Sequence, residues 1–194
     1  FVAILTAFLV FQLYFSYKNN QILKTSIQYN IVKSNSSQND FQEIITQLSQ
    51  EKNFFGILAT LDKINIKLKE KDYNSVNVNY LNLLNKSKLN ILFKSAVATH
   101  AAYSFLNIID KNNEAEITSL INNFLSYIDP NLESYIGFKF EILYLLSVIE
   151  QENNDDQLIY DESLELYKQI QENEKISSSL KERVKKIHEY QKYK

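Results

Sequence analysis

The sequence is poor in residues that make tight turns, and it has no thiols. It contains no cysteine, only two glycines, Gly56 and Gly137, and a single proline, Pro130. The absence of cysteine excludes disulfides, thiol nucleophiles and cysteine-based zinc sites. Tight β-hairpins favour Asn-Gly or Asp-Gly turns, and neither dipeptide occurs in the chain. The composition therefore predicts an all-α fold.

The sequence also lacks the patterns of catalytic, cofactor and metal sites. His100 and His188 are the only histidines, and neither belongs to a zinc-binding motif. We expect His100 to pack within a helical core, with a catalytic role as the less favoured alternative, and His188 to be solvated. The isolated glycines form no phosphate-binding loop, and Gly56 is expected to mark a close approach of two helices. The net charge of −2 provides no broad basic surface for nucleic acid. The sequence thus predicts a protein that is not an enzyme and that needs no cofactor, metal or nucleic acid.

Residues 1–17 carry no charge, and Lys18 follows them directly. As a helix this stretch is about 25 Å long, slightly less than the roughly 30 Å core of a bilayer. The chain has no methionine and starts inside the apolar stretch. We therefore expect residues 1–17 to be a transmembrane anchor truncated at its start, and residues 18–52 to be a helical connector. The alternatives are a buried core helix and the core of a signal peptide, although no small-x-small cleavage site follows.

Apolar residues recur with helical spacing through the rest of the chain. Asp40 with Glu43, and Ser179 with Glu182, have the spacing of a capping box and predict two helix starts. Apolar residues surround the segment 88–110 on most sides, which is typical of a buried helix. The predicted helices pair as hairpins. Between the two helices that begin at capping boxes, the predicted helices cover residues 54–70, 73–85, 88–110, 114–128, 132–150 and 159–170.

The segment FFGILATLDKINIKLKEKDYNSV, residues 54–76, carries a more specific pattern. Phe55, Gly56, Ala59 and Leu61 lie in its first helix, and Tyr73 follows a charged turn. This pattern resembles the tetratricopeptide-like domain of the YfgM family, the ancillary subunits of the bacterial SecYEG translocon. The spacing of Tyr73 and Tyr80 recurs in Tyr160 and Tyr167, as in a loose repeat. The predicted repeat signature therefore consists of Phe55, Gly56, Ala59, Leu61, Tyr73 and Tyr80.

The resemblance implies both an architecture and a location. It implies that residues 53–194 form a tetratricopeptide-like helical repeat domain, an α-solenoid, behind an N-terminal transmembrane helix. A member of this family is a single-pass protein of the bacterial inner membrane with its repeats in the periplasm. The partners that it implies are translocon subunits, exported chains or chaperones.

The aromatic content indicates where a partner would bind. The chain has 13 Tyr and 12 Phe, and tyrosine is favoured at binding surfaces because it offers a large area and a polar tip. Stacked helical hairpins leave a concave groove along their first helices. The residues expected to line it are Tyr103, Tyr135, Phe138 and Tyr144, and the alternative is that these side chains belong to the core.

These observations predict a membrane-anchored, helical-repeat module that binds other proteins. The favoured role is ancillary to the Sec translocon or to the periplasmic chaperone network. The alternative is a structural cell-envelope tether or assembly scaffold that is unrelated to secretion.

Overall fold

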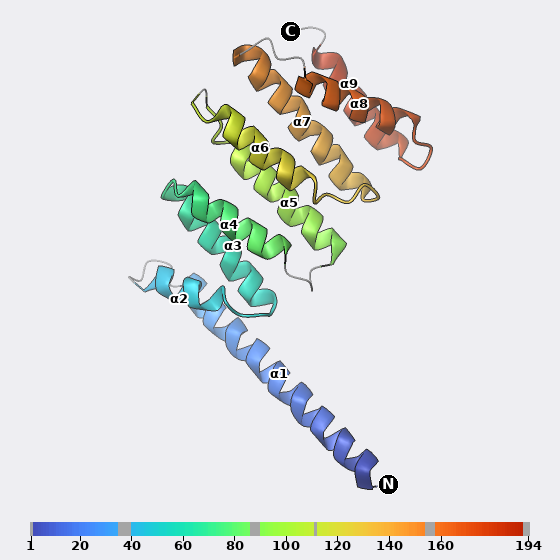
Figure 1. Ribbon diagram of the computed structural model, residues 1–194. Helices are drawn as coiled ribbons and strands as arrows, with labels where there is room; N and C mark the ends of the chain where they lie inside the picture. Colours follow the sequence, from blue (N-terminus) through green and yellow to red (C-terminus); the bar gives the residue numbers. More distant parts are fainter. Residues whose placement is uncertain (1, 35–39, 86–89, 111, 154–157, 192–194) are drawn as a thin grey trace. The chain divides into compact units, whose positions relative to one another are not determined.

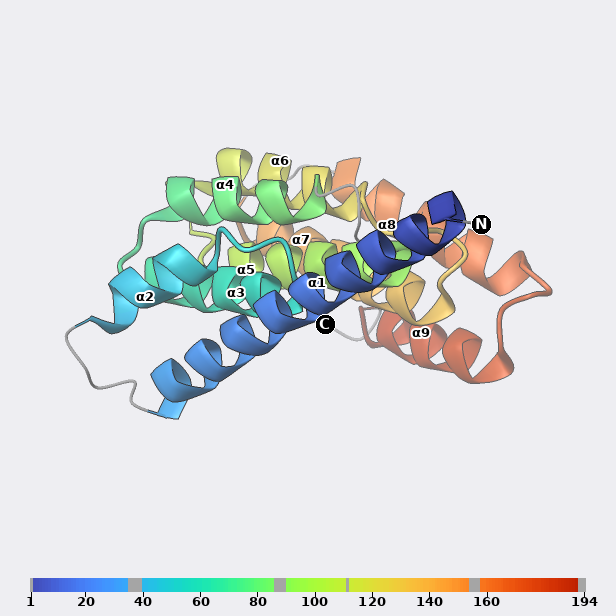
Figure 2. The same ribbon diagram turned by 90° about the horizontal axis from the view of Figure 1, so that it is seen from below.

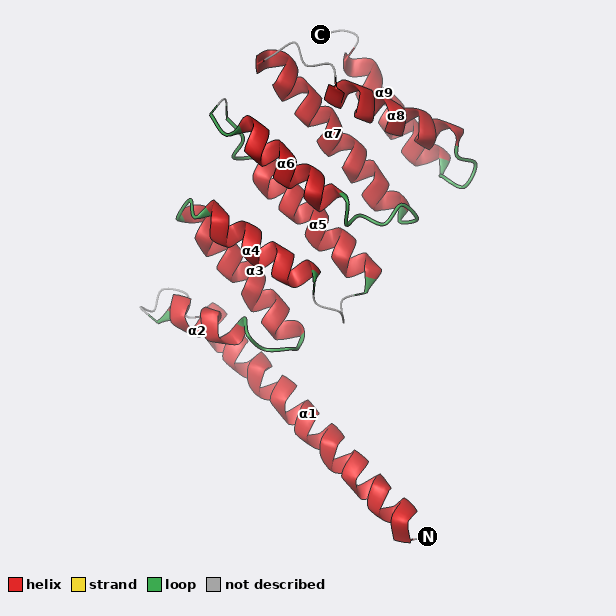
Figure 3. Ribbon diagram, viewed as in Figure 1, coloured by secondary structure: helices red, strands yellow, loops and turns green. Residues whose placement is uncertain are grey.

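The described part of the chain is helical. The computed structural model describes residues 2–34, 40–85, 90–110, 112–153 and 158–191, and none of these residues forms a strand (Figure 1, Figure 3). Their helices pack as consecutive hairpins, which confirms the predicted all-α class. In chain order they are α1 (Val2–Ser34), α2 (Phe41–Leu48), α3 (Phe54–Lys69), α4 (Tyr73–Leu84), α5 (Ile91–Leu106), α6 (Glu114–Leu125), α7 (Glu133–Asn153), α8 (Leu158–Glu172) and α9 (Ser178–Gln191).

The chain divides into two compact units, each of which has its own packing. Phe1–Asn79 forms the N-terminal unit, and Tyr80–Lys194 forms the C-terminal unit. In the N-terminal unit, α1 packs against α2 and α3. The core between these helices consists of buried residues from all three, namely Tyr29, Val32, Ile45, Leu48 and Ala59.

Hydrogen bonds fix α1 against α3. The carboxylate of Asp62 on α3 accepts a hydrogen bond from the Tyr29 hydroxyl at 2.7 Å and one from Lys33 Nζ at 2.7 Å. Burial and the bond to Asp62 raise the pKa of Tyr29, so its phenol stays protonated and able to donate. Asn53 Nδ2, just before α3, donates to Thr25 Oγ1 at 3.2 Å. Because Thr25 meets the start of α3 and Lys33 meets its middle, the two helices run parallel.

The earlier half of α1 lies outside this core. The helix continues unbroken across the border expected at residues 17 and 18, and every residue from 10 to 20 is exposed. The large apolar side chains among them are 49–70% exposed: Val10, Phe11, Leu13, Tyr14, Phe15 and Tyr17. Among the helices that are described, none meets the combined length and apolarity required to cross a bilayer.

In the C-terminal unit, α7 lies between α5 and α9. It contacts both of them, while α6 covers α5 and α8 packs on α7 and α9 (Figure 2). Phe105 of α5 stacks on Phe124 of α6 with ring centroids 5.6 Å apart. A second core joins α7, α8 and α9 through Phe140, Ile170, Ile176, Leu180 and Val184. The helices α5, α7 and α9 therefore lie side by side.

Tertiary contacts set the helix starts differently from the predicted capping boxes. In the described residues, the Asp40 side chain makes no cap hydrogen bond to α2, and its backbone (φ −92°, ψ 2°) is not extended as an N-cap residue usually is. Ser177, rather than Ser179, caps α9, because its Oγ accepts from Leu180 N at 3.3 Å. Glu133 of α7 in turn accepts a hydrogen bond from Ser177 N at 3.1 Å. This contact with α7 fixes the start of α9.

Gly56 marks a close approach, but to a turn and not to a second helix. A Cβ at this position would lie 2.1 Å from the carbonyl oxygen of Glu51, in the connection between α2 and α3. At Gly137 the nearest atom to such a Cβ is Leu180 Cδ1, at 2.7 Å. A methyl group at position 56 would therefore clash with backbone, whereas one at position 137 would meet the end of a flexible side chain.

We expect Gly56→Ala to lower the free energy of unfolding by about 1–3 kcal/mol, since the added methyl group overpacks the α2–α3 connection. Gly137→Ala is the matched control. Leu180 can rotate away there, and alanine favours the helix by up to about 1 kcal/mol. Urea unfolding followed by circular dichroism measures both variants, and equal losses would contradict this interpretation of Gly56.

Candidate functional site

The aromatic residues expected in a groove lie on two neighbouring helices of the C-terminal unit. Tyr103 is on α5, and Tyr135, Phe138 and Tyr144 are on α7. The Tyr103 and Phe138 rings meet edge to face with centroids 6.3 Å apart. The centroids of Tyr135 and Phe138 are 6.1 Å apart. The structure thus brings Tyr103, Tyr135 and Phe138 together, and we call these three residues the aromatic cluster.

A charged pair from α7 and α9 borders the aromatic cluster. Arg183 of α9 lies over the Phe138 ring, 5.6 Å from its centroid, and its Nη2 is 2.6 Å from Glu141 Oε2. The side chains of Arg183 and Glu141 are 51% and 30% exposed, so the pair contributes at most about 1 kcal/mol to stability. Its main effect is to hold the Arg183 guanidinium beside the Phe138 ring.

The Glu141 carboxylate also raises the pKa of Tyr103. Burial, the charge of Glu141 and its hydrogen bond with the phenol together raise the pKa of Tyr103 to about 12, with burial the largest cause and Arg183 opposing them. Tyr103 therefore remains a neutral hydrogen-bonding group at physiological pH.

Tyr144 lies apart from the aromatic cluster and is buried, at 9% exposed, as the core alternative expected. Its remaining exposed surface lines an open hollow between α7 and α9. This hollow has a volume of about 600 Å³. Its apolar wall consists of Tyr144, Leu145 and Ile187. Ser179 and four charged side chains complete the lining: Glu141, Glu182, Arg183 and Lys186. Lys186 Nζ lies 3.0 Å from Glu182 Oε1, so these charges pair with one another as Arg183 does with Glu141.

Sequence motifs did not indicate that Arg183, Glu141 or Ile187 belong to this surface. One signal was present, because Arg183 is the only arginine in a chain that otherwise uses lysine. Arginine stacks on aromatic rings and pairs with carboxylates better than lysine does. Glu141 and Ile187 gave no such signal, since their roles depend on how α7 and α9 pack.

The predicted repeat signature belongs mainly to packing. In the N-terminal unit Gly56 and Ala59 are buried, Leu61 and Tyr73 are half-buried, and Phe55 packs on Tyr29 with centroids 6.0 Å apart. In the C-terminal unit Tyr80 is fully buried. Its hydroxyl lies 2.6 Å from His100 Nδ1 and 2.9 Å from Ser104 Oγ, which ties the end of α4 to α5.

The two histidines occupy different surroundings from those expected. His100 is exposed as a residue, although its ring bonds to Tyr80 and partial burial lowers its pKa. The expectation of a solvated His188 is wrong. This residue is 8% exposed and stacks on Tyr167 of α8 with centroids 4.2 Å apart, because the face of α9 that carries it turns toward α8.

Among the residues that the structure describes, no other cluster forms a site as well defined as this one. A hollow of about 560 Å³ in the N-terminal unit includes Lys33 and Asp62, which already bond to each other. Within the described ranges, no three His, Asp or Glu side chains gather as ligands for a metal ion. The α7–α9 hollow and the adjoining aromatic cluster therefore form the candidate site.

Comparisons with known proteins add no family assignment. No protein-family model matches the chain, and neither the curated proteins nor the solved structures include a significant match.

We expect Glu141→Gln to lower the pKa of Tyr103 from about 12 but to leave it above 10.0, because burial is the larger cause. Neutral Tyr103 stabilises the fold fully below the unfolded pKa near 10, and this contribution is lost as pH rises toward 12. The substitution should therefore narrow the alkaline pH range over which the stabilising contribution of neutral Tyr103 is lost.

Nuclear magnetic resonance of ring-labelled tyrosine measures this pKa, and Tyr103→Phe assigns the signal. Glu182→Gln is the control, because it removes another carboxylate of the hollow. An unchanged pKa in Glu141→Gln, or an equal fall in Glu182→Gln, would contradict the assignment of the effect to Glu141.

Proposed function

We propose that this protein is a membrane-anchored helical-hairpin module of the tetratricopeptide-like type that binds segments of other proteins and is not an enzyme. The observation that supports it most strongly is the exposed apolar part of α1. The aromatic cluster and the α7–α9 hollow supply the binding surface in this proposal.

A lipid environment accounts for residues 10–17 better than a protein neighbour does. Their side chains are exposed around the whole helix and are apolar except for Gln12 and Ser16, which share one narrow face. A helix that packs on one neighbour has a wide polar face toward water, whereas one that is apolar over most of its circumference needs apolar surroundings on most sides. Burying each large side chain gains about 1.5–3 kcal/mol. The proposal rests on this exposure and not on the length of the described helix.

The hollow favours apolar ligands over charged ones. Its wall is made by Tyr144, Leu145 and Ile187, and its acidic and basic side chains pair within the protein. A charged ligand would have to break these pairs, whereas apolar side chains need only displace water from the wall. We therefore propose that the hollow accepts apolar side chains of an unfolded polypeptide.

An exported chain is a polypeptide of this kind. The resemblance of residues 54–76 to the YfgM family supports a role beside the Sec translocon or in the periplasmic chaperone network, on the periplasmic side of the bacterial inner membrane. A cell-envelope tether that binds folded partners is the competing proposal.

The anchor predicts that Phe11→Asp releases the full chain from lipid vesicles, because a carboxylate within the bilayer costs about 2.5–3.5 kcal/mol. Val78→Asp on α4 is the control, since Val78 and Phe11 are similarly exposed, at 55% and 59%. Flotation of vesicles on a density gradient measures binding. Failure of the unaltered chain to float, or flotation of Phe11→Asp like the control, would contradict the anchor.

The hollow predicts that Ser179→Tyr weakens the binding of an unfolded apolar peptide about tenfold, or about 1.4 kcal/mol, by filling the space that one side chain would occupy. Ser178→Tyr is the matched control: both serines are exposed in the first turn of α9, but only Ser179 lines the hollow. Fluorescence anisotropy measures binding of a labelled peptide of alternating Leu and Ser, with Gln in place of Leu as a second probe. Equal binding of the two peptides, or equal effects of the two substitutions, would favour the tether.

A further inference from the structure

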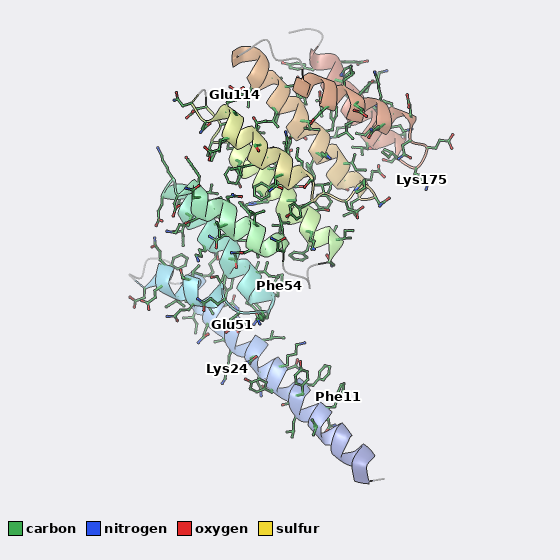
Figure 4. The ribbon with its side chains drawn as sticks, viewed as in Figure 1. Phe11, Lys24, Glu51, Phe54, Glu114 and Lys175 are labelled. Carbon is green, nitrogen blue, oxygen red and sulfur yellow. The ribbon has the colours of Figure 1, made fainter. Side chains whose placement is uncertain are left out.

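The connection between α2 and α3 lies at the end of the N-terminal unit that faces the exposed part of α1. α1 and α3 run parallel, since Thr25 bonds to Asn53 and Lys33 bonds to Asp62. The start of α3 is therefore nearer to Phe11 than its end is. Figure 4 shows Glu51 and Phe54 near the start of α3, and Lys24 on α1 further along toward Phe11.

The helix geometry sets the distance from this connection to the proposed anchor. Thr25 follows Tyr17 by eight residues, or about 12 Å along the helix axis. The headgroup layer extends about 5–7 Å beyond the hydrocarbon core on each side. With α1 along the bilayer normal, a gap of about 5–7 Å remains, comparable to the length of an extended lysine or phenylalanine side chain. Because hydrogen bonds hold Asn53 to Thr25, this connection cannot move away from α1 without breaking them.

The side chains at this end are those that a lipid interface attracts. Phe54 is 51% exposed and packs edge to face on Phe55, while Lys52 beside it is exposed. Lys18 and Lys24 are exposed on the facing part of α1, and Glu51 is the one exposed carboxylate in residues 51–54. No Asp or Glu precedes Asp40 in the sequence. The local charge is therefore positive, and each lysine near an anionic surface contributes about 1 kcal/mol of attraction.

We infer that the α2–α3 connection is a second, peripheral membrane contact, in which Phe54 enters the interface and Lys52, with Lys18 and Lys24 of α1, binds anionic lipid headgroups. This inference rests on the proposed anchor. It adds that the N-terminal unit sits directly on the membrane, because a one-helix anchor alone leaves the unit free to rotate and tilt. Two contacts at different distances from the helix axis restrict that tilt.

The chain has no tryptophan, so a single Trp is an unambiguous reporter. The full chain is bound to vesicles of phosphatidylcholine and phosphatidylglycerol, with bromine near the ester end of the acyl chains as a shallow quencher. Phe11→Trp reports the anchor, Phe54→Trp reports the second contact, and Val78→Trp is an equally exposed control away from the α2–α3 connection. Circular dichroism confirms that each variant keeps its helix content.

We expect the bromolipid to quench Phe11→Trp and Phe54→Trp but not Val78→Trp, and the emission of Phe54→Trp to shift to the blue. Replacing phosphatidylglycerol with phosphatidylcholine should reduce the quenching of Phe54→Trp more than that of Phe11→Trp. If Phe11→Trp is quenched while Phe54→Trp stays as accessible to aqueous acrylamide as Val78→Trp, the anchor stands and the second contact is overturned. If Phe11→Trp is not quenched, the proposed anchor fails and the second contact fails with it.

Discussion

The carboxylate of Asp62 determines how α1 relates to the rest of the N-terminal unit. It accepts hydrogen bonds from Tyr29 and Lys33 on successive turns of α1, beside the core that Tyr29 and Val32 enter. A bond to a charged acceptor contributes more than one between neutral groups, and two donors on one helix face fix both its rotation and its register. The direction in which residues 10–17 leave the unit, and the side on which the α2–α3 connection lies, both follow from this constraint.

In the C-terminal unit, half-buried aromatic side chains lie beside charged groups that pair with one another. Arg183 covers Phe138 and pairs with Glu141, and Lys186 pairs with Glu182. These pairs stabilise the fold little, because they are exposed to solvent. They leave the α7–α9 hollow without a net charge that would select a charged ligand. In the proposed function, this charge balance allows the surface to bind polypeptide segments of different sequences.

The sequence predicted the helices well and their local details less well. The long helical spacings placed α3, α4 and α6 within a few residues, and the aromatic residues Tyr103, Tyr135 and Phe138 do lie together. The cap of α9 was misplaced because Glu133, which is distant in sequence, holds Ser177. His188 was expected in water because its neighbours along the chain are lysines, yet it stacks on Tyr167 of another helix.

Composition and periodicity by themselves determined the all-α class, the pairing into hairpins and the uncharged stretch at residues 1–17, because these depend on intervals of a few residues. Tertiary structure decided everything that needs two helices to meet. It placed Arg183 over Phe138, formed the hollow from residues of α7 and α9, and showed that Gly56 accommodates the turn at Glu51. The physical reason is that helical spacing reveals which face of a helix is apolar, but only packing selects the neighbour and the register against which that face lies.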